Sequence, residues 1–139
     1  MSAPFKITLC GGGNSTHVIA AVASSQGHSV TIYTRKPASW AGPVTLDNVD
    51  SGFMDGRTDI SGNVTAMSDA ASAISGADVV LLAGLPVHLY RDMLSQVCPH
   101  ITRKGVMVGS VCSYGGFKWL IDEAMEACGK VRRSGELRM

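Results

Sequence analysis

The sequence predicts a single α/β domain, residues 1–139, in which a doubly wound, mainly parallel sheet carries helices on both faces. Two observations support this fold class. Short and nearly continuous apolar runs alternate along the chain with longer segments of helical period, as expected when parallel strands are covered on both faces. Glycine, proline and small polar residues mark most of the points where one kind of segment ends and the next begins.

The first elements form a strand–turn–helix–strand unit. Residues 7–10 are a short apolar strand that leads directly into three glycines, and residues 17–23 have the apolar density of a buried helix. The helix is expected to stop at Gly27, because glycine readily adopts the left-handed conformation that follows a helix end. The β-branched and aromatic residues 28–34 then predict a second strand. A strand, a helix and a strand in this order imply a right-handed parallel crossover.

The middle of the chain is punctuated by glycine and proline and keeps no helical period between residues 37 and 63. Within it, the segments 44–46 and 57–60 are expected to pair as a hairpin, so that residues 44–60 form an insertion. Residues 64–67 predict a return strand, and residues 70–75 a short helix that begins after Ser68 or Asp69 as N-cap.

The second half returns to the alternation of strand and helix. The nearly continuous apolar run at 78–84 predicts a central parallel strand. After it we expect a loop at 85–88, a helix at 89–97, a strand at 105–112, an exit loop at 113–116 and a helix at 117–128.

Composition excludes several classes of function. A formal net charge of +1 gives no field for nucleic acid, and the four cysteines are far apart, with no metal-binding spacing, so they predict reduced thiols. No signal peptide and no apolar run of membrane-spanning length is visible, which predicts a cytoplasmic protein. The patterns of a serine hydrolase elbow and of a P-loop are also missing. We expect no metal site, no nucleic-acid partner and no membrane partner.

The glycine turn between the first strand and helix is the leading candidate for a ligand site. Its order is that of a Rossmann-type dinucleotide fingerprint, in which free N–H groups at the helix N-terminus face a pyrophosphate. Thr16 stands at the third fingerprint position, which is usually Gly or Ala, so the alternative is a glycine turn that binds nothing. The expected cofactor-binding residues of this segment are Gly11, Gly12, Gly13, Asn14, Ser15, Thr16 and His17.

Two further loops should meet this turn, because ligands of such sheets bind beyond the carboxyl ends of the strands. From the exit loops at 85–88 and 109–116 we expect contacts from Leu85, Pro86, His88 and Ser110. His17 and His88 also have an ordinary interpretation, as polar residues at helix ends.

The end of the second strand bears on which nicotinamide cofactor binds. An NAD site normally places a carboxylate there, whereas this chain has Thr34, Arg35 and Lys36, and no carboxylate before Asp47. Arg35 can bind a 2′-phosphate bidentately and stack on adenine, and Lys36 adds a second positive charge. We therefore predict NADP(H) in preference to NAD(H). The alternative is that both cations simply lie on a solvated loop.

Four segments together resemble the amino-terminal domain of the opine (octopine) dehydrogenases. Residues 10–17, CGGGNSTH, are similar to the family pattern GGGNGAH, with Ser15 and Thr16 in place of Gly and Ala. The likeness continues in residues 74–82, ISGADVVLL, then in Pro86 with His88, and finally in residues 108–109 and 116–117. The amino-terminal domain of glycerol-3-phosphate dehydrogenases is similar in layout.

The resemblance implies an NAD(P)-dependent oxidoreductase acting on CH–NH or CH–OH donors, of which this chain matches only the cofactor domain. The catalytic His and acidic partner of that family belong to its helical second domain, so no catalytic residue is assigned here. We expect the chain to bind cofactor with little turnover alone, and to work with a separate helical substrate domain or as a homo-oligomer. The alternatives are a stand-alone dinucleotide-sensing or regulatory module, and a structural α/β domain that binds no dinucleotide.

Overall fold

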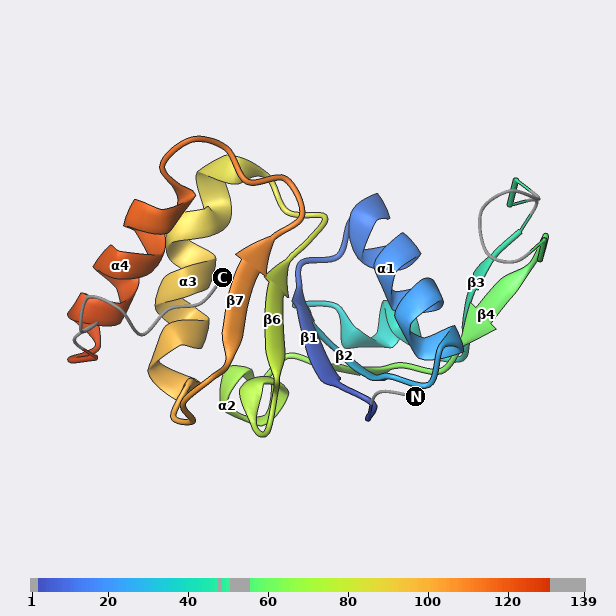
Figure 1. Cartoon of the computed structure of the whole chain (residues 1–139), viewed down its shortest axis with the longest axis horizontal. Helices are drawn as coiled ribbons and strands as arrows, with labels where there is room; N and C mark the ends of the chain where they lie inside the picture. The colour runs from blue at the N-terminus through green and yellow to red at the C-terminus, as the bar shows by residue number, and fades with distance from the viewer. Residues whose placement is uncertain (1–2, 48, 51–55, 131–139) are drawn as a thin grey trace.

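The computed structural model describes residues 3–47, 49–50 and 56–130 and confirms the doubly wound α/β fold (Figure 1). Its main sheet has the strand order β5-β2-β1-β6-β7, and every neighbouring pair is parallel. The chain moves outward from β1 in one direction and then in the other, so the topological switch point lies between β1 and β6. The strands are β1 (Lys6–Cys10), β2 (Ser29–Tyr33), β5 (Thr65–Met67), β6 (Val79–Leu82) and β7 (Met107–Ser110).

Helices cover both faces of the sheet because alternate strand residues point to opposite sides. On one face, Leu9 and Ile32 pack with the alanines of α1 (Asn14–Ser25). On the other face, Val80 and Leu82 pack in a second cluster with the three remaining α-helices. These helices are α2 (Ala70–Ile74), α3 (Tyr90–Val97) and α4 (Phe117–Ala127).

The predicted hairpin is present, with its second strand shifted along the chain. β3 (Val44–Leu46) pairs antiparallel with β4 (Ile60–Gly62), whereas the sequence predicted residues 57–60 for the second strand. The hairpin packs beside α1, and Gly62 lies so close to Ser24 that a Cβ at this position would collide with the serine side chain. Residues 51–55 of the expected turn lie outside the described residues.

The segment before the hairpin and the ends of α3 contain short 3₁₀ turns that periodicity did not reveal. They span Pro37–Trp40, Val87–Leu89 and Cys98–His100. Turns of three or four residues are too short to produce a helical period, so only the proline in two of them marks the sequence. α3 consequently begins at Tyr90, one residue later than expected.

β7 ends at Ser110, two residues earlier than the apolar run predicts, because its partner β6 ends at Leu82 in register with it. Cys112 is therefore exposed and not within the strand. Cys10 and Cys98 are buried free thiols, and burial raises the pKa of Cys10 to about 12 and that of Cys98 to about 11. Both behave as small apolar side chains.

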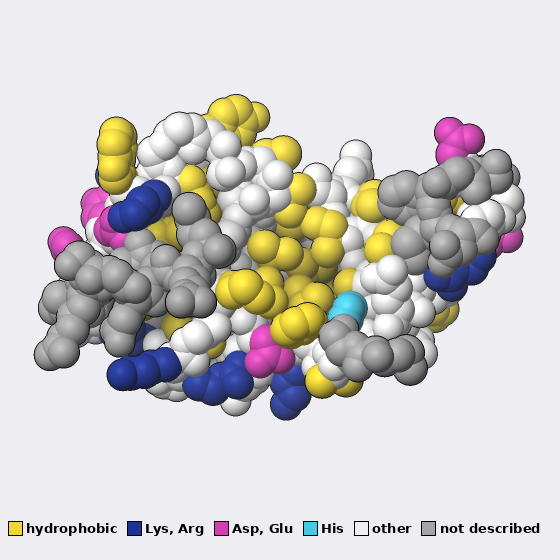
Figure 2. All heavy atoms as spheres, in the orientation of Figure 1, with side chains coloured by type: hydrophobic (Ala, Val, Ile, Leu, Met, Phe, Trp, Pro, Cys, Tyr) yellow, Lys and Arg dark blue, Asp and Glu magenta, His cyan; other side chains and the backbone are white. Residues whose placement is uncertain are grey.

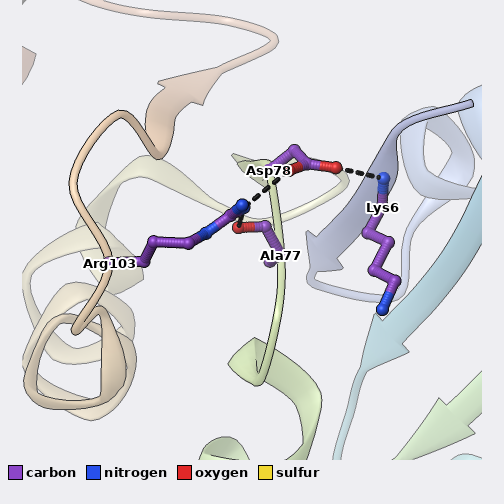
Figure 3. Close-up of polar contacts among 4 residues, drawn as sticks. All are labelled: Lys6, Ala77, Asp78 and Arg103. Atoms are coloured by element: carbon purple, nitrogen blue, oxygen red, sulfur yellow. Dashed lines mark hydrogen bonds and ion pairs between the residues drawn. The ribbon is translucent and has the colours of Figure 1, made fainter. Parts of the chain in front are cut away.

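A polar cluster connects neighbouring segments at the edge of the sheet where the strands β1 and β6 begin (Figure 3). The Asp78 carboxylate accepts the backbone N–H of Lys6 at 2.8 Å and an Arg103 N–H at 2.5 Å. Arg103 also donates to the Ala77 carbonyl oxygen at 2.8 Å. These donors, that of Arg103 first, hold the pKa of Asp78 below its usual value. The cluster joins β1, the start of β6 and the loop that precedes β7.

Candidate functional site

The glycine turn after β1 is held against the loop that follows β6. Gly11 has a φ of 137° and donates its N–H to the Tyr33 carbonyl oxygen at 3.2 Å. Gly13 donates to the Gly84 carbonyl oxygen at 3.0 Å, and a Cβ on Gly13 would lie 2.7 Å from that same oxygen. A Cβ on Gly11 would collide with the Ala83 carbonyl. Both positions therefore require glycine because the loop after β6 approaches closely; the predicted approach of Gly13 to a phosphate stays a prediction.

Thr16, the departure from the fingerprint, is accommodated by a glycine far away in the sequence. Its side chain is fully buried, and its hydroxyl donates to the Ala83 carbonyl oxygen at 2.6 Å. A Cβ at Gly84 would lie only 2.7 Å from the Thr16 hydroxyl oxygen, so the threonine fits because residue 84 has no side chain. The Thr16 side chain thus seats α1 on the end of β6 and does not face the ligand side of the turn.

The N-terminus of α1 offers unpaired donors to an anion. Gly13 is the N-cap and no side chain caps the helix. The first backbone N–H with a partner one turn earlier is that of His17, which donates to the Gly13 carbonyl oxygen at 3.2 Å. The N–H groups of Asn14, Ser15 and Thr16 therefore have no helical acceptor, and the positive end of the helix dipole lies behind them.

A hollow of about 260 Å³ lies beside the glycine turn. The 3₁₀ turn Pro37–Trp40 and the start of β3 bound it. Gly12, Gly13 and Asn14 line one side of it and residues 39–44 the other. His17 also lines it, but its ring donates from Nε2 to the Thr45 carbonyl oxygen at 3.2 Å and lies 5.6 Å from the Trp40 ring. His17 therefore fastens the hairpin to α1.

The predicted cations at the end of β2 lie beside a second hollow of about 130 Å³. Thr34 turns the chain there, because its hydroxyl accepts the N–H of Lys36 at 3.2 Å. Arg35 lines the hollow, and both Arg35 and Lys36 are exposed. Within the described ranges, no salt bridge involves either cation. Both are thus available to a ligand.

Sequence reasoning missed the opposite wall of that hollow, which α3 supplies. Asp92 and Gln96 line it together with Tyr33. Burial, with nearby thiol and carboxylate groups, raises the pKa of Tyr33, and its hydroxyl donates to Gln96 Oε1 at 2.6 Å. Gln96 in turn donates to Asp92 at 2.8 Å. A carboxylate thus reaches the end of β2 from a different element, and nothing near residues 34–36 in the sequence signals it.

A third hollow, of about 190 Å³, lies between the ends of β6 and β7. Ser15, Leu85 and Pro86, three of the residues expected to bind cofactor, line it. His88 is exposed on the adjoining 3₁₀ turn and does not line this hollow. The Ser110 hydroxyl is turned toward the protein interior and donates to the Tyr90 hydroxyl at 2.9 Å.

The arrangement fits a dinucleotide. Two glycines bring the backbone close to the β6 loop, an uncapped helix supplies three N–H donors, and residues of the turn and of the helix start line two hollows. In the described part of the chain, no group of three or more His, Cys, Asp or Glu could hold a metal ion. None of the described helices is both long and apolar enough to cross a bilayer.

The family model described as "NAD-dependent glycerol-3-phosphate dehydrogenase N-terminus" matches residues 6–118. The chain belongs to this family. It is an NAD(P)-binding amino-terminal domain of the glycerol-3-phosphate dehydrogenase family, and it is similar in sequence and structure to octopine dehydrogenase. The resemblance to the opine dehydrogenases, expected from four segments of the sequence, and the likeness in layout to the glycerol-3-phosphate dehydrogenases are confirmed.

Individual relatives agree with this assignment. The chain is 29% identical over 102 residues to a glycerol-3-phosphate dehydrogenase [NAD(P)+] of Acinetobacter baumannii, covering 73% of this chain and 28% of that protein. It is 27% identical over 122 residues to octopine dehydrogenase of Pecten maximus, covering 82% and 30% of the two chains. A solved octopine dehydrogenase structure superposes with a TM-score of 0.74 at 26% identity over 87% of this chain and 32% of that one. The chain thus spans less than a third of the length of these relatives.

Proposed function

We propose that this chain binds NADP(H) in preference to NAD(H) and serves as the cofactor-binding domain of an opine-dehydrogenase-like oxidoreductase. The observation that carries the preference is the end of β2, where Arg35 lines a hollow and Lys36 is exposed beside it. Neither cation is neutralised by a described acidic side chain. A 2′-phosphate is negatively charged, and two of its oxygens can each accept a hydrogen bond from one guanidinium group.

The Asp92 carboxylate does not contradict this preference, although it lines the same hollow as Arg35. It already accepts a hydrogen bond from Gln96 and lies on α3, across the hollow from the end of β2. An NAD site uses a carboxylate on the strand end itself, where it accepts from the ribose hydroxyls. In this chain that position is held by Thr34, whose hydroxyl oxygen accepts the Lys36 N–H.

The relatives include proteins that use either cofactor. The octopine dehydrogenase structure was solved with NADH and L-arginine, and a yersinopine dehydrogenase structure, 15% identical, with NADP+. The choice in this chain therefore depends on its own side chains at residues 34–36.

The chemistry of the proposed enzyme follows from what the site holds and what it lacks. A bound nicotinamide cofactor supplies a hydride. The residues of this chain would hold the cofactor: the N–H groups at the start of α1 would bind its phosphates, and the hollow between β6 and β7 would take its reactive ring. Turnover further requires a substrate-binding surface and a group that exchanges protons, which we assign to the larger part of the relatives that this chain does not match.

The test is parallel calorimetric titration with NADPH and NADH at one fixed moderate salt concentration. A charge-assisted contact contributes about 1.5–3 kcal/mol, so we expect NADPH to bind at least about 10-fold more tightly than NADH. Arg35→Asp should abolish this difference by weakening NADPH binding while leaving NADH binding close to that of the wild type. Lys104→Asp is the matched control, because it makes the same charge change at an exposed residue before β7.

Equal affinities, or tighter NADH binding, would refute the preference while leaving the dinucleotide site intact. A loss of NADPH affinity in Lys104→Asp as large as in Arg35→Asp would show that only net charge matters.

A further inference from the structure

The loop that follows β7, residues 111–116, forms one wall of the hollow between β6 and β7. Three of its side chains, Val111, Cys112 and Tyr114, line that hollow. Val111 is 44% exposed and Tyr114 is 63% exposed. In Figure 2, hydrophobic side chains project at the upper edge of the molecule, where Figure 1 draws the loop between β7 and α4. A wall built of exposed side chains keeps one shape only if the backbone beneath them is held.

The backbone of this loop leaves the sheet after Val111. The last hydrogen bond to β6 joins the Val111 N–H to the Leu82 carbonyl oxygen at 3.1 Å. In the part of the chain that the structure describes, one hydrogen bond holds residues 112–113, and it comes from a side chain: the Tyr90 hydroxyl donates to the Cys112 carbonyl oxygen at 3.1 Å. The first residue of α3 therefore anchors the loop at the point where the sheet no longer does.

The Tyr90 hydroxyl has a fixed orientation. A carbonyl oxygen can only accept, so the single hydrogen of the phenol points to Cys112. The Ser110 hydroxyl must then be the donor in its contact with the Tyr90 oxygen, at 2.9 Å. The ring is held as well, because Tyr90 is 3% exposed and its centroid lies 5.7 Å from that of the Phe117 ring, at the start of α4. Tyr90 thus joins both ends of the loop to α3.

We propose that Tyr90 is a positioning residue for the reactive end of the cofactor: its hydroxyl holds residues 111–114 in the conformation that leaves room for the nicotinamide ring. The inference rests on the proposed function, which assigns the hollow between β6 and β7 to that ring. Because the one hydrogen of the hydroxyl is bonded to the Cys112 carbonyl, Tyr90 acts through the loop and not as a proton donor.

The contribution of Tyr90 should be confined to one end of the cofactor. Tyr90 and the loop line the hollow between β6 and β7, whereas Arg35 and the glycines at 12–13 line the two hollows described before it. Without the hydroxyl the loop has more conformations, and ordering it on binding costs free energy that lowers the affinity for the ring. One neutral hydrogen bond corresponds to about a 5-fold change in an equilibrium constant.

Two ligands that differ only at the ring test the proposal. The whole chain is titrated in a calorimeter with NADPH and with 2′-phospho-ADP-ribose, which lacks the nicotinamide. The wild type should bind NADPH more tightly, because only NADPH fills the hollow. Tyr90→Phe removes the hydroxyl and keeps the ring contact with Phe117. This variant should bind NADPH about 5-fold more weakly than the wild type and 2′-phospho-ADP-ribose equally well.

A spectroscopic readout and a matched variant separate positioning from stability. At saturating NADPH, the fluorescence of the reduced ring should increase less in Tyr90→Phe than in the wild type, because the ring is less confined. Thr8→Val is the control: the Thr8 hydroxyl is also buried and donates to a carbonyl oxygen, that of Ala73, at 2.7 Å. Neither residue lines the hollow. Thr8→Val should lose stability in urea unfolding, yet bind both ligands like the wild type.

Three results would overturn the role of Tyr90 while leaving the dinucleotide site in place. They are a wild type that binds the two ligands equally, a Tyr90→Phe variant that binds NADPH like the wild type, and an equal loss of affinity for both ligands. A wild type that binds neither ligand, and no NADH, would refute the proposed function, and the role of Tyr90 with it. If NADH bound more tightly than NADPH, only the cofactor preference would fail, and NADH with ADP-ribose would test Tyr90 in the same way.

Discussion

Removing the Thr16 hydroxyl measures how much the departure from the dinucleotide fingerprint contributes to stability. Thr16→Val keeps the shape of the side chain but deletes the donor that meets the Ala83 carbonyl oxygen at 2.6 Å. Thr16 is fully buried, so that carbonyl loses a partner that water cannot readily replace. A buried polar group left unpaired costs about 1–3 kcal/mol. For a chain of this length, each 1 kcal/mol lowers Tm by roughly 3–5 °C.

The assay is urea unfolding followed by circular dichroism, with a thermal melt as the second readout. Thr45→Val is the matched control, because Thr45 is exposed and shares its hydrogen bond with Ser61, so its loss should stay within about 0.5 kcal/mol. The expected result is a lower urea midpoint for Thr16→Val with an unchanged slope. If the two variants were equally stable, the Thr16 hydroxyl would not be what seats α1 on β6.

Two further outcomes follow from the same structure. Gly13→Ala should weaken dinucleotide binding at least about 10-fold in calorimetry, because its Cβ would lie 2.7 Å from the Gly84 carbonyl oxygen. Gly115→Ala is the control and should bind like the wild type, because a Cβ at that position would have nothing within 4 Å. Equal binding by the two variants would contradict the close approach at Gly13. The pKa of Asp78 is lowered in the folded protein, so its stabilisation is complete above its unfolded pKa of about 3.9 and is lost as pH falls through the lower folded value. Asp78→Asn should therefore be less stable than the wild type at pH 7, with the difference shrinking in urea melts below pH 4; a constant difference would exclude this ionisation as its cause.

The order of strands and helices could be predicted because each element carries a local signal. Residues 78–84 form a nearly continuous apolar run, typical of a strand covered on both faces. Asp69, one of the two expected N-caps of α2, accepts the Ser72 N–H at 2.9 Å as a capping side chain does. The errors occur where the signal is not local. The strand at 105–112 was predicted too long, because its end is set by the last residue of β6 and not by its own composition.

The candidate site shows the same difference between local signals, which could be predicted, and contacts between distant residues, which could not. The glycine turn was predictable because strand, glycines and helix adjoin in the sequence. Gly84, the residue that accommodates Thr16, could not be predicted, because it is distant in the chain and meets Thr16 only through the β1–β6 pairing. Asp92 was missed for the same reason, since α3 brings it to the end of β2.

The contact between Gly13 and Gly84 links two parts of the site that the sequence presents as separate. Gly13 donates to the Gly84 carbonyl, and Gly84 also lines the hollow between β6 and β7. The loop that positions the N–H groups at the start of α1 is therefore also one wall of the hollow that we propose for the reactive ring. A change at Gly84 should alter both together, because a Cβ there would lie 2.6 Å from the Gly13 nitrogen and 2.7 Å from the Thr16 hydroxyl oxygen. The threonine in the fingerprint and the glycine after β6 consequently form one structural unit, and restoring the usual alanine at residue 16 would remove only half of it.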